Sequence, residues 1–229
     1  MHSATEGPAY FATFLDAHGV PWQVIRVCDG ELAPADVREF SGLGLMGGPM
    51  SVNDDLPWVA PELTLIREAV RVDIPLIGHC LGGQLISKAL GGVVSRNPLK
   101  EIGWGRVDVV NAAEGRRWLG AVASFNSFHW HGETFTIPEG ATRFAASAAC
   151  ANQMFAMGKH VGMQCHVEMT AELINAWCAD WQTEVVSLTA HTPSVQAPDE
   201  MLERVDEKVA ALHATADRLY SEWIKGLVA

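Results

Sequence analysis

The sequence predicts an α/β fold in which helices cover both faces of a mainly parallel sheet. Short runs of apolar and β-branched residues alternate with segments whose apolar residues recur at a spacing of three and four, as buried strands and amphipathic helices do. The runs end in breaks such as Gly47-Gly48-Pro49 and Gly91-Gly92. This alternation favours parallel strands joined by helical crossovers, so we expect a flavodoxin-like domain.

The first half of the chain carries most of the alternation. We expect helices at residues 8–17, 60–71 and 81–90, and strands at residues 22–27, 42–46 and 74–77. Only seven residues precede the first helix, too few for a strand of ordinary length and its turn. The opening strand of the sheet is therefore very short or missing.

The second half is richer in strands, and a helix starts near Thr170. We expect strands at about residues 102–110, 122–129, 142–147, 152–157 and 160–166. Ser, Thr, Pro and His dominate residues 187–198, which indicates a surface connection, and the spacing from Leu202 to Trp223 predicts a long amphipathic helix. Residues 1–186 are thus the expected domain, and residues 187–229 a connection and a helix that packs on it or on a second subunit.

Composition excludes several classes of protein. With 48% hydrophobic and 19% charged residues, the chain has the balance of a globular protein and not of a disordered one. It has no apolar run of the ~18 residues that span a bilayer and no secretory signal at the N-terminus, so we expect a cytoplasmic protein without a membrane partner. A net charge of −11 without a basic cluster argues against nucleic acid as a partner.

The cysteines argue against a disulfide scaffold. There are five, at positions 28, 80, 150, 165 and 178, and none forms a C-x-x-C pair. An odd number at such spacing predicts free thiols.

Cys80 is the candidate nucleophile. It stands in Ile77-Gly78-His79-Cys80-Leu81-Gly82, where a buried strand turns into a helix. Small residues on both sides permit a sharp turn that pushes the cysteine out of the sheet edge, as in the G-x-S-x-G elbow of hydrolases. The helix N-terminus beside it favours the reactive thiolate. A small buried cysteine is the alternative, but the flanking glycines argue against it.

His166 and Glu168 are the candidate base and its orienting carboxylate. His166 ends a strand-like run, and residues at the carboxyl ends of strands line the ligand crevice of open α/β sheets. Histidine both accepts and returns a proton near neutral pH. Glu168 would orient the ring and stabilise its charged form, which completes a Cys–His–Glu triad. Alone, His166 would be an ordinary polar residue at a strand end.

The segment from Met46 to Ser51 is the third candidate element. Its glycines follow a buried strand and let backbone N–H groups approach a negatively charged oxygen. The N–H groups of Gly48 and Leu81 would together form an oxyanion hole. By itself, Gly-Gly-Pro indicates only a turn.

Taken in order, G-G-P, G-x-C-x-G-x-Q and Q-x-H-x-E resemble the motifs of class I glutamine amidotransferases, over roughly residues 5–185. Within this family the chain is most similar to stand-alone proteins related to the amidotransferase domain of GMP synthases. The resemblance implies Cys80, His166 and Glu168 as the triad. It also implies a protein that hydrolyses the side-chain amide of glutamine through a cysteine thioester, without a cofactor or metal, and releases ammonia for an acceptor.

The same resemblance implies the substrate contacts. The glutamine of the elbow motif, which contacts bound glutamine in the family, matches Gln84. The segment that holds the amino-acid end of glutamine matches residues 128–132, and we take Trp130 and His131 from it. The usual Q-F-H-P-E reads Gln164-Cys165-His166-Val167-Glu168 here, and loss of the proline relaxes the turn that aims His166. No synthetase domain follows, so the acceptor would come from a separate protein, and a homo-oligomer is an open option.

Two other functions stay open. A γ-glutamyl hydrolase or peptidase would use the same triad on γ-glutamyl conjugates without transferring ammonia. A non-catalytic metal- or redox-binding protein would use His129 and His131, which alternate on one strand face, with Cys165 and His166 as further ligands. The spacing of these residues matches no compact zinc motif.

Overall fold

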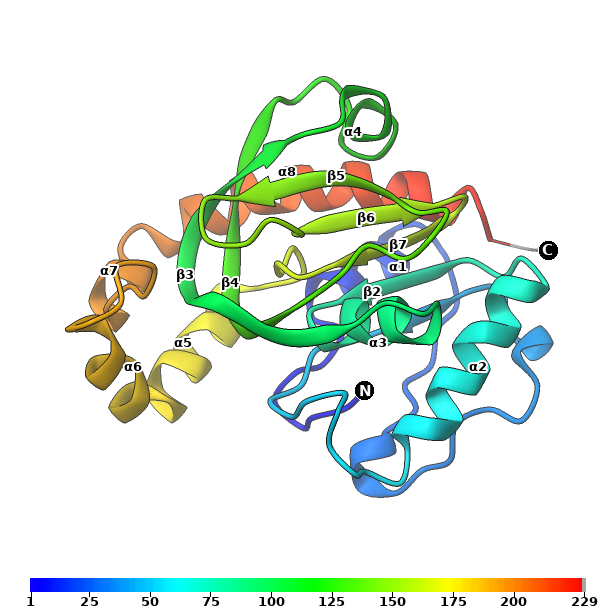
Figure 1. Ribbon diagram of the computed structural model, residues 1–229. Coiled ribbons are helices and arrows are strands. Elements are labelled where there is room, and N and C mark those ends of the chain that lie inside the picture. Colours follow the sequence, from blue (N-terminus) through cyan, green and yellow to red (C-terminus); the bar gives the residue numbers. More distant parts are fainter. Residues whose placement is uncertain (228–229) are drawn as a thin grey trace.

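The fold is built on a mixed sheet of seven strands with helices around it (Figure 1). The computed structural model describes residues 1–227. The strand order is β1-β2-β7-β6-β5-β3-β4. The strands are β1 (Leu43–Leu45), β2 (Leu76–His79), β3 (Val94–Val109), β4 (Ser124–Phe135), β5 (Thr142–Ser147), β6 (Met154–Met157) and β7 (His160–Met163).

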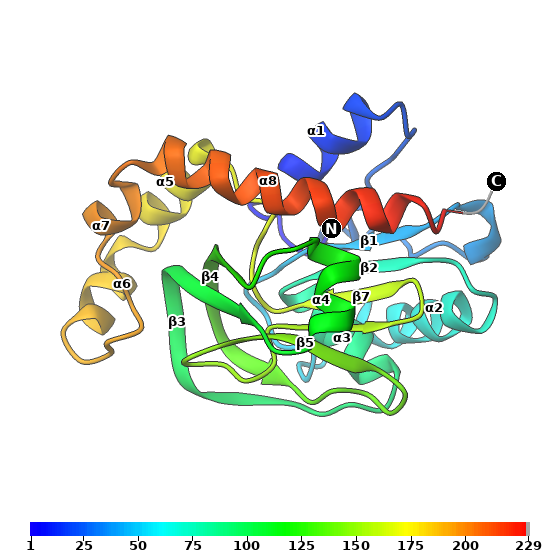
Figure 2. The same cartoon turned by 90° about the horizontal axis from the view of Figure 1, so that it is seen from above.

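Helices lie on both faces of this sheet (Figure 2). The α-helices are α1 (Tyr10–Ala17), α2 (Val59–Arg71), α3 (Leu81–Ala89), α4 (Ala112–Leu119), α5 (Ala171–Asp180), α6 (Gln182–Thr189), α7 (Pro198–Leu202) and α8 (Val205–Ile224). Short 3₁₀ turns occupy Val27–Asp29 and Val37–Glu39. No helix within residues 1–227 is both long and apolar enough to cross a membrane.

The sheet has a parallel and an antiparallel part, which meet at β7. Strand β2 pairs parallel with β1 and with β7. Beyond β7, the pairs β6–β7, β5–β6, β3–β5 and β3–β4 are antiparallel. The predicted α/β class is confirmed, with its parallel strands at the end of the sheet that carries the elbow.

The core lies on both faces because neighbouring residues of a strand point to opposite sides. In β2, Ile77 belongs to the apolar cluster under α1 and α8, whereas Leu76 belongs to the cluster under α2 and α3. Both side chains are fully buried. The runs of consecutive apolar residues in the sequence are therefore strands covered on both faces.

The predicted strand at residues 22–27 is wrong. Residues 20–26 form no helix or strand, and Trp22 is 42% exposed. A cavity of about 700 Å³ separates this segment from β1, and apolar side chains such as Phe11 and Leu15 of α1 line it. β-Branched residues favour a strand only where a neighbour completes the ladder, and no neighbour lies in this space among residues 1–227.

The second half departs from the expected bounds in several ways. Strand β3 begins at Val94 and not near residue 102, and β4 runs on to Phe135. Helix α4 was not expected, although Asn111 caps its first N–H groups. Helix α6 runs through the expected boundary at residue 187. The long C-terminal helix is interrupted at Arg204, whose φ of 52° separates α7 from α8. Helix α8 lies against α1, α4 and β4 of the same chain.

Candidate active site

Cys80 lies in a strained turn between β2 and α3. Its φ is 49°, in a region that residues with side chains rarely adopt and that is found at functional sites. The surrounding backbone is tightly packed, because a Cβ added to Gly78 would lie 2.5 Å from the carbonyl of Gly82. Glycine at position 78 therefore lets the end of β2 pass the start of α3. Cys80 is the N-cap of α3, a position where the helix dipole favours negative charge.

His166 and Glu168 follow β7, the strand next to β2. The Nδ1 atom of His166 donates a hydrogen bond to Glu168 Oε1 at 2.6 Å, and both side chains are buried. Strand β4 fixes the backbone of His166 with two hydrogen bonds. The His166 N–H donates to the Phe128 carbonyl at 2.9 Å, and Ser127 Oγ donates to the His166 carbonyl at 3.0 Å. These bonds aim the ring without the proline that the family motif usually has.

The electrostatics of this pair favour a charged imidazole. Burial acts to lower the pKa of His166, but the negative charges of Glu168 and Cys80 outweigh it and raise the pKa well above its usual value. Burial acts to raise the pKa of Glu168, and the positive charge of His166 outweighs it and lowers the pKa to about 2. His166 Nε2 is buried and has no hydrogen-bond partner within residues 1–227, so it is free for a reacting group.

A cavity of about 260 Å³ opens onto Cys80 and is lined by four other residues that the sequence indicated: Gly48, Gln84, Trp130 and His131. His166, Glu168 and Leu81 do not line it. Leu81 is the first residue of α3 and packs against Gly48, because a Cβ added to Gly48 would lie 2.8 Å from Leu81 Cδ2. The first N–H groups of a helix have no partner within it. The N–H group of Leu81 is among these and directly follows Cys80 in the chain.

Gln164 is a site residue that the sequence argument passed over. Its Nε2 donates to Cys80 Sγ at 3.5 Å, and its Oε1 accepts a hydrogen bond from Gln84 Nε2 at 3.1 Å. Gln164 therefore links the side chain of Gln84 to the sulfur of Cys80. The signal was available, since this glutamine opens the same motif that contains His166.

Glu6 is a second such residue. It lines the cavity with Trp177. A Cβ added to Gly47 would lie 2.1 Å from Glu6 Oε2 and 3.3 Å from His166 Cε1, so the two side chains approach each other over this glycine. Burial raises the pKa of Glu6 to about 7. An isolated glutamate near the N-terminus gave no signal in the sequence.

Glu101, His129 and His131 offer ligand atoms within 4.8 Å of one another and are the group that could hold a metal ion. Cys165 and His166, which the metal hypothesis added, are not part of this group. Burial lowers the pKa of His129 to about 4, which keeps its ring neutral.

A hydrogen-bond network already satisfies Glu101. Its carboxylate accepts from Ser147 Oγ at 2.7 Å, Gln153 Nε2 at 2.8 Å and His131 Nε2 at 3.0 Å. His131 Nδ1 lies 2.9 Å from the Glu133 carbonyl oxygen. The network ties the cavity wall at His131 to β3 and β5, and it needs no ion to do so.

The fold and this site define a class of protein, and the comparisons agree. The family model described as "Glutamine amidotransferase class-I" matches residues 16–177. The chain belongs to the class I glutamine amidotransferase family. A solved glutamine amidotransferase of Methylobacillus flagellatus superposes with a TM-score of 0.96 at 43% identity, over 99% of this chain and 92% of that one. The flavodoxin-like fold expected from the sequence is confirmed.

Curated relatives fall into several kinds. The glutamine amidotransferase-like protein YfeJ of Salmonella typhimurium is 33% identical over 81% of this chain and 80% of its own. Gamma-glutamyl peptidase 3 of Arabidopsis thaliana is 28% identical over 72% of this chain and 71% of its own. A GMP synthase of Vibrio vulnificus is 31% identical over 61% of this chain and 27% of its own. The resemblance to the amidotransferase part of GMP synthases is confirmed.

Proposed function

We propose that the protein is a cysteine-dependent glutamine amidotransferase that hydrolyses the side-chain amide of glutamine. The observation that carries the proposal is a cysteine at a strained helix start that lines the cavity and interacts with the buried His166, which is itself hydrogen-bonded to Glu168. Thiolate and imidazolium together supply a nucleophile and a proton for the leaving group. Family membership supports this class of chemistry.

The first half of the reaction forms a thioester. The sulfur of Cys80 attacks the amide carbon, and the carbonyl oxygen becomes an oxyanion. The N–H groups of Gly48 and Leu81 stabilise that oxygen. His166 Nε2 then gives its proton to the amide nitrogen, the C–N bond breaks, and ammonia leaves.

The second half releases glutamate. His166, now neutral, takes a proton from water, the resulting hydroxide attacks the thioester carbon, and the Cys80 sulfur leaves as thiolate. Glu168 keeps the ring oriented and stabilises its charge in both halves. Gln84 contacts the bound glutamine, and Trp130 and His131 hold its amino-acid end.

Ammonia would go to a separate acceptor. We propose a synthetase or acceptor protein as the partner, by analogy with GMP synthases, and neither a cofactor nor a metal is required for the steps above. A homo-oligomer is compatible with the proposal. A cytoplasmic location agrees with the five cysteines, each of which is free.

A γ-glutamyl peptidase or hydrolase is the second candidate. It is favoured by the similarity to gamma-glutamyl peptidase 3 over most of this chain. The thioester is the same in both cases, and only the leaving amine differs. The cavity of about 260 Å³ is small for a drug-sized ligand, since such pockets begin at about 300 Å³, which agrees with glutamine or a short γ-glutamyl conjugate.

The decisive experiment labels the nucleophile and compares two substrates. A glutamine analogue with an alkylating group should modify Cys80, as mapped by mass spectrometry of the digested protein. Ammonia release from glutamine and amine release from γ-glutamyl dipeptides should then be measured side by side, with Cys80→Ser as the inactive control. Labelling of Cys165 with Cys80 left free, in a protein inactive on both substrates, would overturn the proposal.

A further inference from the structure

Glu6 is a carboxylate at the cavity that the proposed reaction steps do not use. It lines the cavity together with Cys80. A Cβ added to Gly47 would lie 2.1 Å from Glu6 Oε2 and 3.3 Å from His166 Cε1, so these two atoms approach each other over the glycine. Cε1 is bonded to Nε2, the atom that protonates the leaving nitrogen under the proposed function. Glu6 therefore lies near the place where the leaving amine departs.

The chain segment around Glu6 is tied to the His166 ring by Trp177. The Nε1 atom of Trp177 donates a hydrogen bond to the Thr5 carbonyl at 3.1 Å. The Trp177 ring also packs edge-on against the ring of His166, with the centroids 5.2 Å apart. Because Glu6 directly follows Thr5, one tryptophan fixes its place relative to the histidine.

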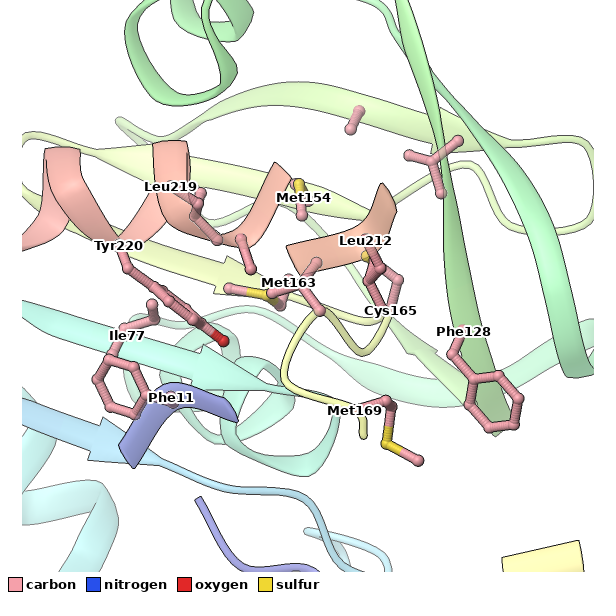
Figure 3. Close-up of a cluster of buried hydrophobic side chains, with 14 of the residues drawn as sticks. Phe11, Ile77, Phe128, Met154, Met163, Cys165, Met169, Leu212, Leu219 and Tyr220 are labelled. Carbon is pink, nitrogen blue, oxygen red and sulfur yellow. The ribbon is translucent and has the colours of Figure 1, made fainter. Parts of the chain in front are cut away.

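The helix that follows Glu6 is anchored as well. The Tyr10 N–H, at the start of α1, donates to the Glu168 carbonyl at 2.9 Å. Figure 3 shows Phe11 extending from α1 into the buried apolar cluster, where its ring centroid lies 4.8 Å from that of Tyr220. Both sides of the short segment are thus held, and Glu6 is part of the site and not of a free tail.

The carboxylate of Glu6 is available to a ligand. Burial raises its pKa to about 7, and among the described residues the charges of His166 and Glu168 are the other influences on it, with no hydrogen bond to offset the burial. At pH 8 most of these carboxyl groups are ionised. A carboxylate accepts N–H groups and repels other negative charges at short range.

The cation at the cavity lies at a different wall. Among the described residues that line the cavity, Lys100 is the one lysine or arginine. A Cβ added to Gly132 would lie 3.7 Å from Lys100 Cγ, so the lysine belongs to the β3–β4 wall that contains His131. It is also ion-paired with Glu184. A negatively charged leaving group would therefore lie near Glu6 without a lysine or arginine beside it.

We propose that Glu6 selects the leaving amine: the substrates are γ-glutamyl amides that release ammonia or an amine without a carboxylate, and γ-glutamyl dipeptides are disfavoured. The inference rests on the proposed function of Cys80, His166 and Glu168. The leaving nitrogen must reach His166 Nε2 to receive its proton, which brings the group attached to this nitrogen near Glu6. In a γ-glutamyl dipeptide that group carries a carboxylate, whereas the leaving group of glutamine is ammonia.

A contact between Glu6 and the α-ammonium group of the substrate is the alternative role. Glutamine and every γ-glutamyl conjugate share that ammonium group. Loss of such a contact would therefore raise KM for all of these substrates alike. An effect that depends on the charge of the leaving group separates selection of the amine from binding of the common part.

The test compares γ-glutamylethylamide with γ-glutamylglycine, which differ in the charge of the leaving amine. Their kcat/KM values are measured at pH 8 for the wild type and for Glu6→Gln. We expect the wild type to prefer the ethylamide about tenfold, which corresponds to about 1.4 kcal/mol and is the size of a partly screened contact between like charges. Glu6→Gln should lose most of this preference because γ-glutamylglycine becomes a better substrate. Glutamine should change by less than about threefold, since the new amide oxygen still accepts an N–H group.

Glu133→Gln is the matched control, because it removes a different negative charge from the lining of the same cavity. Glu133 accepts a hydrogen bond from Ser51 Oγ at 3.1 Å, and the preference for the ethylamide should persist in this variant. An equal loss of preference in both variants, a wild type that prefers γ-glutamylglycine, or a uniform rise in KM in Glu6→Gln overturns the proposal.

A second measurement needs no amide hydrolysis. Cys80 is modified with aminoethyl methanethiosulfonate, which is a cation, and with sulfonatoethyl methanethiosulfonate, which is an anion, and the rates are read by peptide mapping. The ratio of the cationic to the anionic rate should fall about fivefold at Cys80 in Glu6→Gln, and it should stay constant at Cys28, a partly exposed cysteine. An unchanged ratio at Cys80 overturns the role of Glu6 and leaves the proposed function standing. If the wild type hydrolyses no amide but the ratio falls, the proposed function is contradicted, and Glu6 still sets the charge preference of the cavity.

Discussion

The two parts of the sheet contribute different things to the site. The parallel part, β1, β2 and β7, places Cys80, His166 and Glu168 where neighbouring strands end on the same edge. The antiparallel part contributes one wall, Trp130 and His131 on β4. Parallel strands bring their carboxyl ends together, whereas a long antiparallel ribbon presents a surface. Under the proposed function, the reacting groups therefore come from the parallel part, and the antiparallel part adds one wall of the cavity.

This division implies different kinetic effects. Changes in the parallel part should lower kcat or disturb the fold around the elbow. Changes in the antiparallel wall should mainly raise KM, because they affect the binding of the ground state. The four predictions below test this contrast, from the largest expected effect to the smallest.

Loss of the nucleophile should have the largest effect. Cys80→Ala should abolish amide hydrolysis, with a loss on the order of a thousandfold or more, and His166→Ala should fall to a similar level because the triad acts as a unit. Steady-state ammonia release measures this. Cys28→Ser, a partly exposed cysteine, is the control and should keep full activity. Near-wild-type hydrolysis by a folded Cys80→Ala variant would contradict the assignment of the nucleophile to the parallel part of the sheet.

A methyl group at the elbow should be the next most damaging change. Gly78→Ala places a Cβ 2.5 Å from the backbone of Gly82, so the end of β2 and the start of α3 must separate. A loss of about 2–4 kcal/mol in the free energy of unfolding is expected. Gly132→Ala on β4 is the comparison, because its added Cβ would meet Lys100 only at 3.7 Å. Urea titration of both variants should show a much larger loss for Gly78→Ala, and equal losses would contradict the contrast.

Weakening the network behind His131 should raise KM. Glu101→Gln removes the charge that holds three donors, which lets the β4 wall move. We expect KM for glutamine to rise about tenfold while kcat changes less than threefold, since the contact is made equally in ground and transition states. Full kinetics at fixed pH measure this. If kcat fell as much as in Cys80→Ala, the Glu101 network would have a direct role in catalysis, which would contradict the prediction.

The smallest effect of the four should come from Glu6, which lines the cavity and lies over Gly47 near His166. Its pKa is about 7 in the folded protein, above the usual 4.5, because of burial. The folded state therefore keeps this proton to a higher pH than the unfolded chain, and stability falls as the pH rises from about 4.5 to 7. Glu6→Gln should raise Tm by a few degrees at pH 8 and by less at pH 5. Thermal melts of the variant and the wild type at the two pH values measure this gain in Tm. A larger gain at pH 5 than at pH 8 would contradict the raised pKa of Glu6.

The sequence predicted the parallel part well because its signals are local. The turn at Cys80 needs glycines within four residues, and His166 and Glu168 are two residues apart. Gln164 stands in the same motif and was missed only because its side chain turns back toward Cys80. These features are set by short-range sterics and by the position of strand ends.

Other parts depend on contacts that no local pattern contains. Tyr220 bonds a histidine 141 positions earlier in the chain, and Glu6 meets His166 only in the folded protein. Residues 22–27 have the composition of a strand, but a strand also needs a neighbour at the right distance. The antiparallel wall was expected in outline, whereas the network of Glu101 with Ser147 and Gln153 follows from the pairing of β3 with β4 and β5 and of β5 with β6.

The space beside β1 has a consequence for how the protein behaves when it is concentrated or heated. Strand β1 pairs with β2 on one side, and on the other side lies the cavity of about 700 Å³. Its outer N–H and C=O groups are a template on which another polypeptide can add a strand. The shortness of β1, three residues, and the segment 20–27 that also lines the cavity limit such growth. Self-association, where it occurs, should therefore begin at this edge, and β4 should be protected because the backbone of His166 already bonds Phe128.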